Sequence, residues 1–248
     1  MEQPLEFGQL PDRFNALVVG GGGIGHALAE QLHAHAQCQH LAVAGRHSRC
    51  ESADSQHPID FAEPDSAQHL ANSVAAHCPR LHLVVICTGL LNQPPHGPEK
   101  SLDQVKSSTL EQAFAVNAIG PLQLLQSLLP LLTHDEPSLI AALSARVGSI
   151  EDNRLGGWYS YRASKAALNQ LWKTAAIELG RRRRHPTCVL LHPGTVDTPL
   201  SRPFQANVPP ERLFEPARAA KQLLTVMAGV TRDDNGRFFA WDGAAIPW

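Results

Sequence analysis

The sequence predicts one α/β domain over residues 1–248, built on a doubly wound, mainly parallel sheet with helices on both faces. Short apolar runs alternate with longer stretches of helical spacing along almost the whole chain. A glycine-rich turn follows the first apolar run and opens the first helical stretch, which is where such sheets bind nucleotides. A chain of 248 residues also suits one domain with one core.

The predicted strands are short runs rich in leucine or β-branched residues and bounded by glycine, proline or aspartate. They cover residues 16–19, 41–44, 81–87, 139–143, 188–191 and 238–241. The predicted helices cover residues 24–36, 67–77, 109–132, 161–179 and 216–228. The proline-rich segments 92–98 and 198–210 come after predicted strands, so we expect them to wall a substrate site at the carboxyl edge of the sheet.

The composition excludes several classes of protein. Hydrophobic residues make up 43% of the chain, charged residues 18%, and the net charge is -2, which argues against nucleic acid as the main partner. Residues 1–9 do not resemble a secretory signal and the apolar stretch 122–132 is too short to span a bilayer, so we expect a cytoplasmic protein without a membrane partner. Five scattered cysteines without C-x-x-C indicate reduced thiols, and no histidine pattern predicts a metal site.

The glycine-rich turn satisfies the dinucleotide-binding pattern G-x-G-x-x-G. It comprises Gly20, Gly21, Gly22, Gly23, Ile24 and Gly25. Glycine permits a tight turn and close approach of the backbone, so that free amides at the helix start can bind a pyrophosphate. A glycine-rich turn without a ligand is the alternative. A phosphate loop that binds ATP is disfavoured, because His26-Ala27 stands where that motif needs lysine followed by serine or threonine.

The end of the second predicted strand indicates which dinucleotide binds. An acidic residue there would hold the adenosine ribose of NAD. This chain instead has Arg46 and Arg49 and no carboxylate, so NADP(H) is favoured, and NAD(H) stays possible. Two solvated arginines are the alternative.

Tyr161 and Lys165 open the predicted helix 161–179, and their spacing places phenol and ammonium on the same face. A free phenol, with a pKa of about 10, is a poor acid–base catalyst at neutral pH. A neighbouring ammonium and an oxidised nicotinamide would both stabilise the phenolate and lower that pKa. Tyr161 could then protonate a carbonyl oxygen while a hydride arrives at the carbon. A chance pair on a helix surface is the alternative.

The segment 156–169, with the sequence Gly-Gly-Trp-Tyr-Ser-Tyr-Arg-Ala-Ser-Lys-Ala-Ala-Leu-Asn, resembles the active-site helix of the short-chain dehydrogenases/reductases. Together with segments 191–198 and 242–248 it is most similar to the C-factor and Sniffer-like carbonyl reductase branch of that family. The resemblance runs from about Asn15 to the carboxyl terminus. It implies a Rossmann-like fold, a nicotinamide cofactor, and a homodimer or homotetramer paired through helices 109–132 and 161–179, with a monomer as the alternative.

The resemblance also implies catalytic roles. Tyr161 matches the family's acid–base, and Lys165 the residue that binds the nicotinamide ribose and lowers the tyrosine pKa. Ser144 matches the serine that hydrogen-bonds the substrate carbonyl, with Ser149 as the rival candidate and a loop-capping role as the alternative for both. Asn117 matches the asparagine that holds a water on the proton relay, although an asparagine bonded to the backbone or to solvent is also possible.

Further positions correspond to the family's cofactor contacts. Asp60 matches the acidic residue at the adenine edge, and Thr198 the hydroxyl that contacts the nicotinamide carboxamide, with a turn-capping threonine as the alternative. The full set of expected cofactor contacts is Gly20, Gly22, Gly23, Ile24, Gly25, Arg46, Asp60, Gly89, Asn117, Tyr161, Lys165, Pro193, Gly194, Val196 and Thr198.

The chain departs from the family pattern in four places. The glycine turn is one residue shorter than T-G-x-x-x-G-x-G, and Ile86-Cys87-Thr88-Gly89 stands where most members have Asn-Asn-Ala-Gly. The spacing from Ser144 to Tyr161 is longer than usual, which we explain by an enlarged loop at 150–157. The segment after Thr198 is short and predicts a small substrate lid.

We therefore expect an NADPH-dependent reductase of a small-molecule aldehyde or ketone, with the reverse oxidation equally allowed. A regulatory protein that binds NAD(P)(H) with little turnover is the second hypothesis. A serine hydrolase is disfavoured because the chain lacks G-x-S-x-G. The substrate itself stays open, and the candidates for an apolar pocket lining are Leu90, Leu91, His96, Trp158, Pro199 and Phe204.

Overall fold

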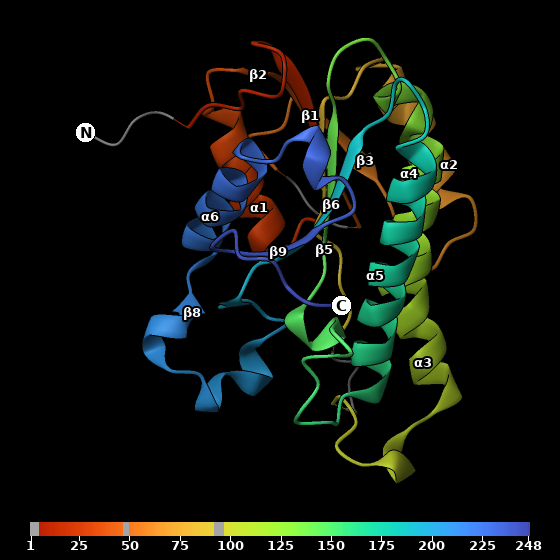
Figure 1. Cartoon of the computed structure of the whole chain (residues 1–248), viewed down its shortest axis with the longest axis vertical. Helices are drawn as coiled ribbons and strands as arrows, with labels where there is room; N and C mark the ends of the chain where they lie inside the picture. The colour runs from red at the N-terminus through yellow and green to blue at the C-terminus, as the bar shows by residue number, and fades with distance from the viewer. Residues whose placement is uncertain (1–4, 47–49, 92–96) are drawn as a thin grey trace.

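A parallel sheet of seven strands forms the centre of the molecule, in the order β3-β2-β1-β4-β5-β6-β9 (Figure 1). The computed structural model describes residues 5–46, 50–91 and 97–248. The strands are β1 (Phe14–Val19), β2 (Cys38–Gly45), β3 (Ser55–Pro58), β4 (Leu83–Ile86), β5 (Leu139–Leu143), β6 (Thr187–His192) and β9 (Phe238–Ala240). The predicted doubly wound, mainly parallel α/β sheet is confirmed.

Helices cover both faces of the sheet because each right-handed crossover places its helix against one face. On one face lie α1 (Gly23–His33) and α6 (Pro216–Ala228), whose leucines share a core with Phe7 and with Phe14, Ala16 and Val18 of β1. On the other face lie α2 (Ser66–Ala75), α4 (Gly120–Leu132) and α5 (Tyr159–Leu179), which enclose the buried Trp172. Figure 1 shows the two groups of helices on opposite sides of the strands.

The carboxyl ends of the central strands gather the sequence motifs at one edge of the sheet. Val19 of β1 is followed by the glycine turn, β2 by Arg46, and β4 by the segment that contains Gly89. Ser144 follows β5, and the turn that begins at Pro193 follows β6. Parallel sheets bind their ligands at this edge, so the fold alone brings these motifs to one place.

The structure differs from the sequence prediction in three elements. The predicted helix 109–132 consists of α3 (Ser107–Phe114), a π-helical turn (Ala115–Ile119) and α4. The edge strand β3 was not predicted, because Ser-Gln-His-Pro has no apolar run. A small second sheet pairs β7 (Thr195–Val196) with β8 (Leu213–Phe214) beyond β6.

The continuous helical stretch Ser107–Leu132 is long and apolar enough to cross a membrane by length and composition. Half of its most apolar window is buried in this fold, where Leu124, Leu125 and Leu128 pack against the sheet. The burial identifies its apolar face as part of the protein core. Ile119 and Ile177 remain exposed on the helices predicted to form a subunit interface, and oligomerisation through them stays a prediction.

Two buried histidines make the stability of this fold sensitive to mild acid. Burial, and then neighbouring His77 and His40, lower the pKa of His57 below 6.5. Burial also lowers the pKa of His82, against the opposing effect of Glu136. Below about pH 6.5 the unfolded chain therefore binds more protons than the folded chain, and stability falls as pH falls. We expect urea unfolding midpoints to decrease between pH 7.5 and 5.5.

The variant His57→Gln should have a lower urea midpoint than the wild type at pH 7.5, but its midpoint should decrease less between pH 7.5 and 5.5. A wild-type midpoint that is flat or rises over this pH range would contradict the assignment of these histidines as neutral in the fold.

Candidate active site and cofactor site

The glycine turn holds α1 against the end of β1 more closely than any side chain would allow. A methyl group at Gly25 would lie 1.8 Å from the Gly20 carbonyl oxygen. Gly20 itself has a φ of +113°, and a methyl group there would lie 3.0 Å from the backbone carbon of Cys87. Both glycines are therefore required for steric reasons, and they fix where α1 begins.

The first turn of α1 suits an anionic ligand. Gly22 stands at the N-cap without a side-chain hydrogen bond, no acidic residue lies in the first turn, and a methyl group at Gly22 would meet no atom within 4 Å. The first amides of a helix lack partners within it, so an uncapped, open helix start can bind phosphate oxygens. The hydroxyl Oγ1 of Thr88, at the end of β4, is buried without a partner among the described residues. These features fit a dinucleotide.

The turn after β6 borders the same place. A methyl group at Gly23 would lie 2.9 Å from Cγ2 of Thr198, so Thr198 lies against the start of α1. The φ of Gly194 is +78°, and a methyl group there would lie 2.6 Å from the Phe214 ring. Pro193 precedes this glycine, and Val196 of β7 is buried. The structure thus brings the expected nicotinamide contacts next to the expected pyrophosphate contacts.

The residues expected at the adenosine end lie after β2 and β3. Arg46 is exposed directly after β2. Residues 47–49, which include Arg49, are outside the described part of the chain. Asp60 is half-buried, and its Oδ1 accepts the Ala62 amide at 3.0 Å. The carboxylate of Asp60 thus already stabilises a turn, and its expected contact with adenine stays a prediction.

Tyr161 and Lys165 lie together on the first turns of α5. The Lys165 Nζ is 5.9 Å from the centroid of the Tyr161 ring and donates to the Leu143 carbonyl oxygen at 2.8 Å. Burial lowers the pKa of Lys165 to about 8 and raises the pKa of Tyr161 to about 12. At neutral pH the phenol is therefore protonated and the amine is largely an ammonium, which is the pair of states that a proton donor supported by a cation needs.

Asn117 is fully buried in the π-helical turn between α3 and α4. Its Oδ1 accepts the Leu90 amide at 2.7 Å, and its Nδ2 donates to the Leu90 carbonyl at 2.8 Å and to Ser164 Oγ at 3.0 Å. A methyl group at Gly89 would lie 3.9 Å from both Asn117 Oδ1 and Lys165 Nζ, so the three residues converge. A π-turn interrupts the regular hydrogen bonds of a helix and is frequent at functional sites.

The two candidate serines are both engaged elsewhere in the protein. Ser144, buried at the end of β5, donates its hydroxyl proton to Asn169 Oδ1 at 2.6 Å, and Asn169 donates to the Gly148 carbonyl at 3.2 Å. Ser149 donates to the carbonyl of Trp248 at 3.2 Å. A serine has one proton to donate, so Ser144 must exchange its acceptor before it can hydrogen-bond a substrate carbonyl. Its role in carbonyl binding stays a prediction.

A cavity of about 290 Å³ opens beside Tyr161. Its lining includes Leu90 and Leu91, as expected, together with Glu99 and Ser160. The Trp158 ring lies 6.3 Å from the Tyr161 ring and 5.0 Å from that of Phe204, so the segment after β7 reaches the active-site helix. Of the other residues expected to line the pocket, Pro199 is exposed and His96 is outside the described residues.

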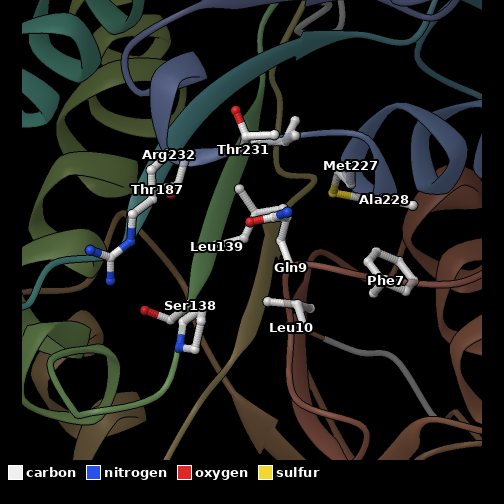
Figure 2. Close-up of a pocket in the computed structure, with 12 residues that line it drawn as sticks. Phe7, Gln9, Leu10, Ser138, Leu139, Thr187, Met227, Ala228, Thr231 and Arg232 are labelled. Atoms are coloured by element: carbon white, nitrogen blue, oxygen red, sulfur yellow. The ribbon is translucent and has the colours of Figure 1, made fainter.

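The other end of the sheet carries a smaller cavity, shown in Figure 2, of about 40 Å³. It lies among Phe7, Leu10, Ser138, Leu139 and the end of α6, where β5 begins. This volume has room for one or two waters and none for a dinucleotide.

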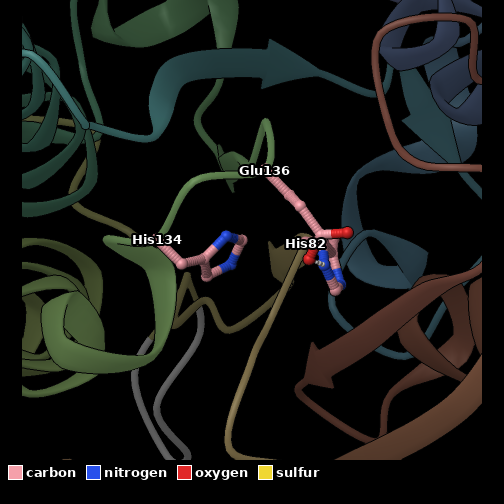
Figure 3. A group of neighbouring side chains, drawn as sticks. All are labelled: His82, His134 and Glu136. Carbon is pink, nitrogen blue, oxygen red and sulfur yellow. Dashed lines mark hydrogen bonds and ion pairs between the residues drawn. The ribbon is translucent and has the colours of Figure 1, made fainter.

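Figure 3 shows a group of possible metal ligands at that same end: His82, His134 and Glu136, with ligand atoms within 4.8 Å of one another. The Asn15 amide donates to Nδ1 of His82 at 3.0 Å, so the proton of a neutral ring is on Nε2 and faces Glu136 at 3.2 Å. A metal would need the lone pair of that nitrogen. The hydrogen bonding of His82 thus favours a polar network over a metal centre: neutral His82 shares a hydrogen bond with Glu136, which forms an ion pair with Arg80.

Comparisons with known proteins show which family this chain is similar to. The family model described as short chain dehydrogenase matches residues 15–209. The 1-hydroxy-2-glutathionyl-2-methyl-3-butene dehydrogenase of Rhodococcus sp. is 30% identical over 94% of this chain and 98% of its own. The C-signal of Myxococcus xanthus is 32% identical over 66% of this chain and 96% of its own.

Among solved structures, the NADPH-bound carbonyl reductase from chicken fatty liver superposes with a TM-score of 0.78 at 25% identity, over 95% of this chain and 99% of that one.

The contrast between two glycines of the turn provides a test of this site. Gly25→Ala places a methyl group against the Gly20 carbonyl and should destabilise the protein by about 3 kcal/mol or more, because the helix must move. Gly22→Ala meets no atom and should cost no more than about 1 kcal/mol, the loss of a favourable N-cap. Thermal unfolding of both variants measures the difference. Equal losses at the two positions would refute the steric account of the turn.

Proposed function

The chain belongs to the short-chain dehydrogenase family, and from this premise we propose that it reduces an aldehyde or ketone to an alcohol with NADPH. The observation that carries the proposal is the pairing of Tyr161 with the buried Lys165 at the edge of the sheet where the uncapped α1 begins. We propose that the substrate is a small molecule and that two copies of the chain pair through the helical stretches 109–132 and 161–179.

The cofactor proposal rests on the charges around the end of β2. Arg46 follows this strand and no carboxylate stands beside it in the described sequence, which favours a ribose 2′-phosphate. The solved structure from chicken fatty liver contains NADPH. We therefore propose NADP(H) as the preferred cofactor, and NAD(H) as the alternative that a titration would reveal.

The proposed mechanism uses the protonation states of the free site. A bound nicotinamide cofactor supplies the hydride. Tyr161 is a protonated phenol at neutral pH and donates its proton to the carbonyl oxygen of the substrate. The Lys165 ammonium, 5.9 Å from the ring centroid, stabilises the phenolate that forms. Asn117 hydrogen-bonds the backbone of Leu90 and so holds the segment whose Gly89 borders the Lys165 ammonium. The reverse sequence oxidises an alcohol.

A second candidate function is a regulatory protein that binds the dinucleotide with little turnover. The similarity to the C-signal of Myxococcus xanthus is the observation that favours it. The Tyr161 and Lys165 pair argues for turnover, because packing alone does not require a buried ammonium beside a phenol.

The chain contains only two tyrosines, which gives a matched pair of variants. Tyr161→Phe should lower kcat/KM for carbonyl reduction by about 10²–10⁴-fold, because the proton donor is lost, while NADPH binding persists. Tyr159→Phe, two residues away and exposed, should leave kcat/KM unchanged. The measurements are fluorescence titrations with NADPH and NADH, followed by a carbonyl screen at 340 nm. NADPH binding without wild-type turnover on any carbonyl would favour the regulatory function, and no binding of either cofactor would refute both.

The serine proposal has its own test. If Ser144 polarises the substrate carbonyl, Ser144→Ala should lower kcat by about 10²-fold without loss of NADPH affinity. Ser149→Ala should change kcat little, because this hydroxyl contacts the carboxyl-terminal Trp248. A large effect of Ser149→Ala alone would transfer the role to Ser149, and wild-type kcat in both variants would remove serine from the mechanism.

A further inference from the structure

Glu99 is a buried acidic residue that the mechanism above does not use. Only 3% of its surface is exposed, and it lies in the segment after β4, at the wall of the cavity beside Tyr161. Its carboxylate makes two hydrogen bonds to one residue: Oε1 accepts the hydroxyl of Ser160 and Oε2 accepts the Ser160 amide at 3.2 Å. Ser160 directly precedes Tyr161 in the first turn of α5.

The start of α5 depends on contacts from elsewhere in the chain. Gly156, Gly157 and Trp158 all have positive φ, between +54° and +65°, so the chain enters the helix through three successive left-handed residues. Trp158 at the N-cap makes no side-chain cap hydrogen bond. Its amide donates instead to the backbone carbonyl of Glu99 at 2.5 Å. A non-glycine residue in the left-handed region persists only where its surroundings hold it.

Glu99 therefore takes the place of a local capping residue at the start of α5. A cap accepts the orphan amides of the first turn, and a carboxylate there also interacts favourably with the positive end of the helix dipole. Here the acceptor comes from a segment about sixty residues earlier in the chain. The backbone carbonyl of Glu99 binds the Trp158 amide, and its carboxylate binds Ser160. These contacts on both sides of residue 159 fix the direction in which α5 leaves the preceding loop.

We propose that Glu99 is a positioning residue for the proposed reaction: it caps the catalytic helix from outside and so holds the Tyr161 phenol where the substrate carbonyl must bind. The proposal rests on the proposed function for its kinetic consequence, but the placement of Tyr161 can be measured without turnover. The Glu99 carboxylate accepts both of its hydrogen bonds from Ser160, so it acts through α5 as a positioning residue.

The kinetic test compares Glu99→Ala and Glu99→Asp with a matched control. In Glu99→Ala, kcat should fall by about 10- to 100-fold, because a displacement of about 1 Å at the reacting group has such an effect, while the Kd for NADPH stays within about twofold. Glu99→Asp keeps the charge and should recover part of the loss. Glu151→Gln removes an exposed carboxylate from the loop before α5 and should leave kcat unchanged.

The second readout needs no substrate. In the Tyr159→Phe background Tyr161 is the single tyrosine, and its ionisation can be followed by NMR with tyrosine labelled with ¹³C at Cζ. The buried Tyr161 should ionise with a pKa of about 12 with Glu99 in place, and closer to the ordinary 10.0 in Glu99→Ala, because a released helix start exposes the phenol to water. If Glu99→Ala does not fold, Ser160→Ala, which removes only the hydroxyl donor, should shift kcat and the ionisation in the same direction.

The outcomes separate this proposal from the proposed function. Unchanged kcat and an unchanged Tyr161 titration in Glu99→Ala, or in Ser160→Ala where Glu99→Ala does not fold, would overturn the positioning role. An absence of carbonyl turnover in the wild type, together with the expected shift in the titration, would overturn the proposed function and leave the positioning role intact.

Discussion

The contact between Gly25 and the Gly20 carbonyl oxygen determines where every other part of the site can lie. It places the first turn of α1 directly beyond the end of β1, with the uncapped Gly22 facing open space. The neighbouring contacts extend from this point. Gly20 lies against Cys87 at the end of β4, and Thr198 lies against Gly23. A larger residue at position 25 would move α1 away from β1, and the turns after β4 and β6 would then border a gap rather than a dinucleotide site.

Burial of charge is the second constraint on this molecule. Lys165 is almost fully buried, and an ammonium in such a place needs compensation because it has lost its hydration. The carbonyl of Leu143 provides one acceptor. Burial lowers the pKa of Lys165 to about 8, so a nearby negative charge would stabilise its ammonium form. A phenolate on Tyr161, as in the proposed reduction, would be such a charge. Burial thus disfavours the charged form of each side chain alone, and the ammonium and the phenolate stabilise each other when both are present.

The sequence predicted the strands, the main helices and the edge of the sheet where the site lies, because all of these follow from apolar runs and their spacing. Edge strand β3 escaped prediction because its polar Ser-Gln-His-Pro sequence has no apolar run, although it pairs with β2 in parallel. The π-turn at Asn117 depends on the bonds of its side chain to Leu90, which no periodicity reveals. The pairing of Ser144 with Asn169 was equally invisible, because it joins a strand end to a helix twenty-five residues later. Tyr161 and Lys165 could be found because both lie on one helix at the right spacing, whereas Glu99 could not, since its partner is far away in sequence.

The chain turns sharply at Gly156, Gly157 and Trp158, the three left-handed residues before α5. The position of the helix therefore depends little on the path of the loop that precedes them. Leu155 and Ile150 in this loop are almost fully exposed and contribute nothing to the core. Since the helix start is tied to Glu99 across the chain, we expect that residues can be added to or lost from the loop without displacing the phenol. Such a loop would be free to diverge in evolution while the chemistry is retained. The unusually long interval between Ser144 and Tyr161 is an expected product of such freedom, and substrate preference could change there independently of catalysis.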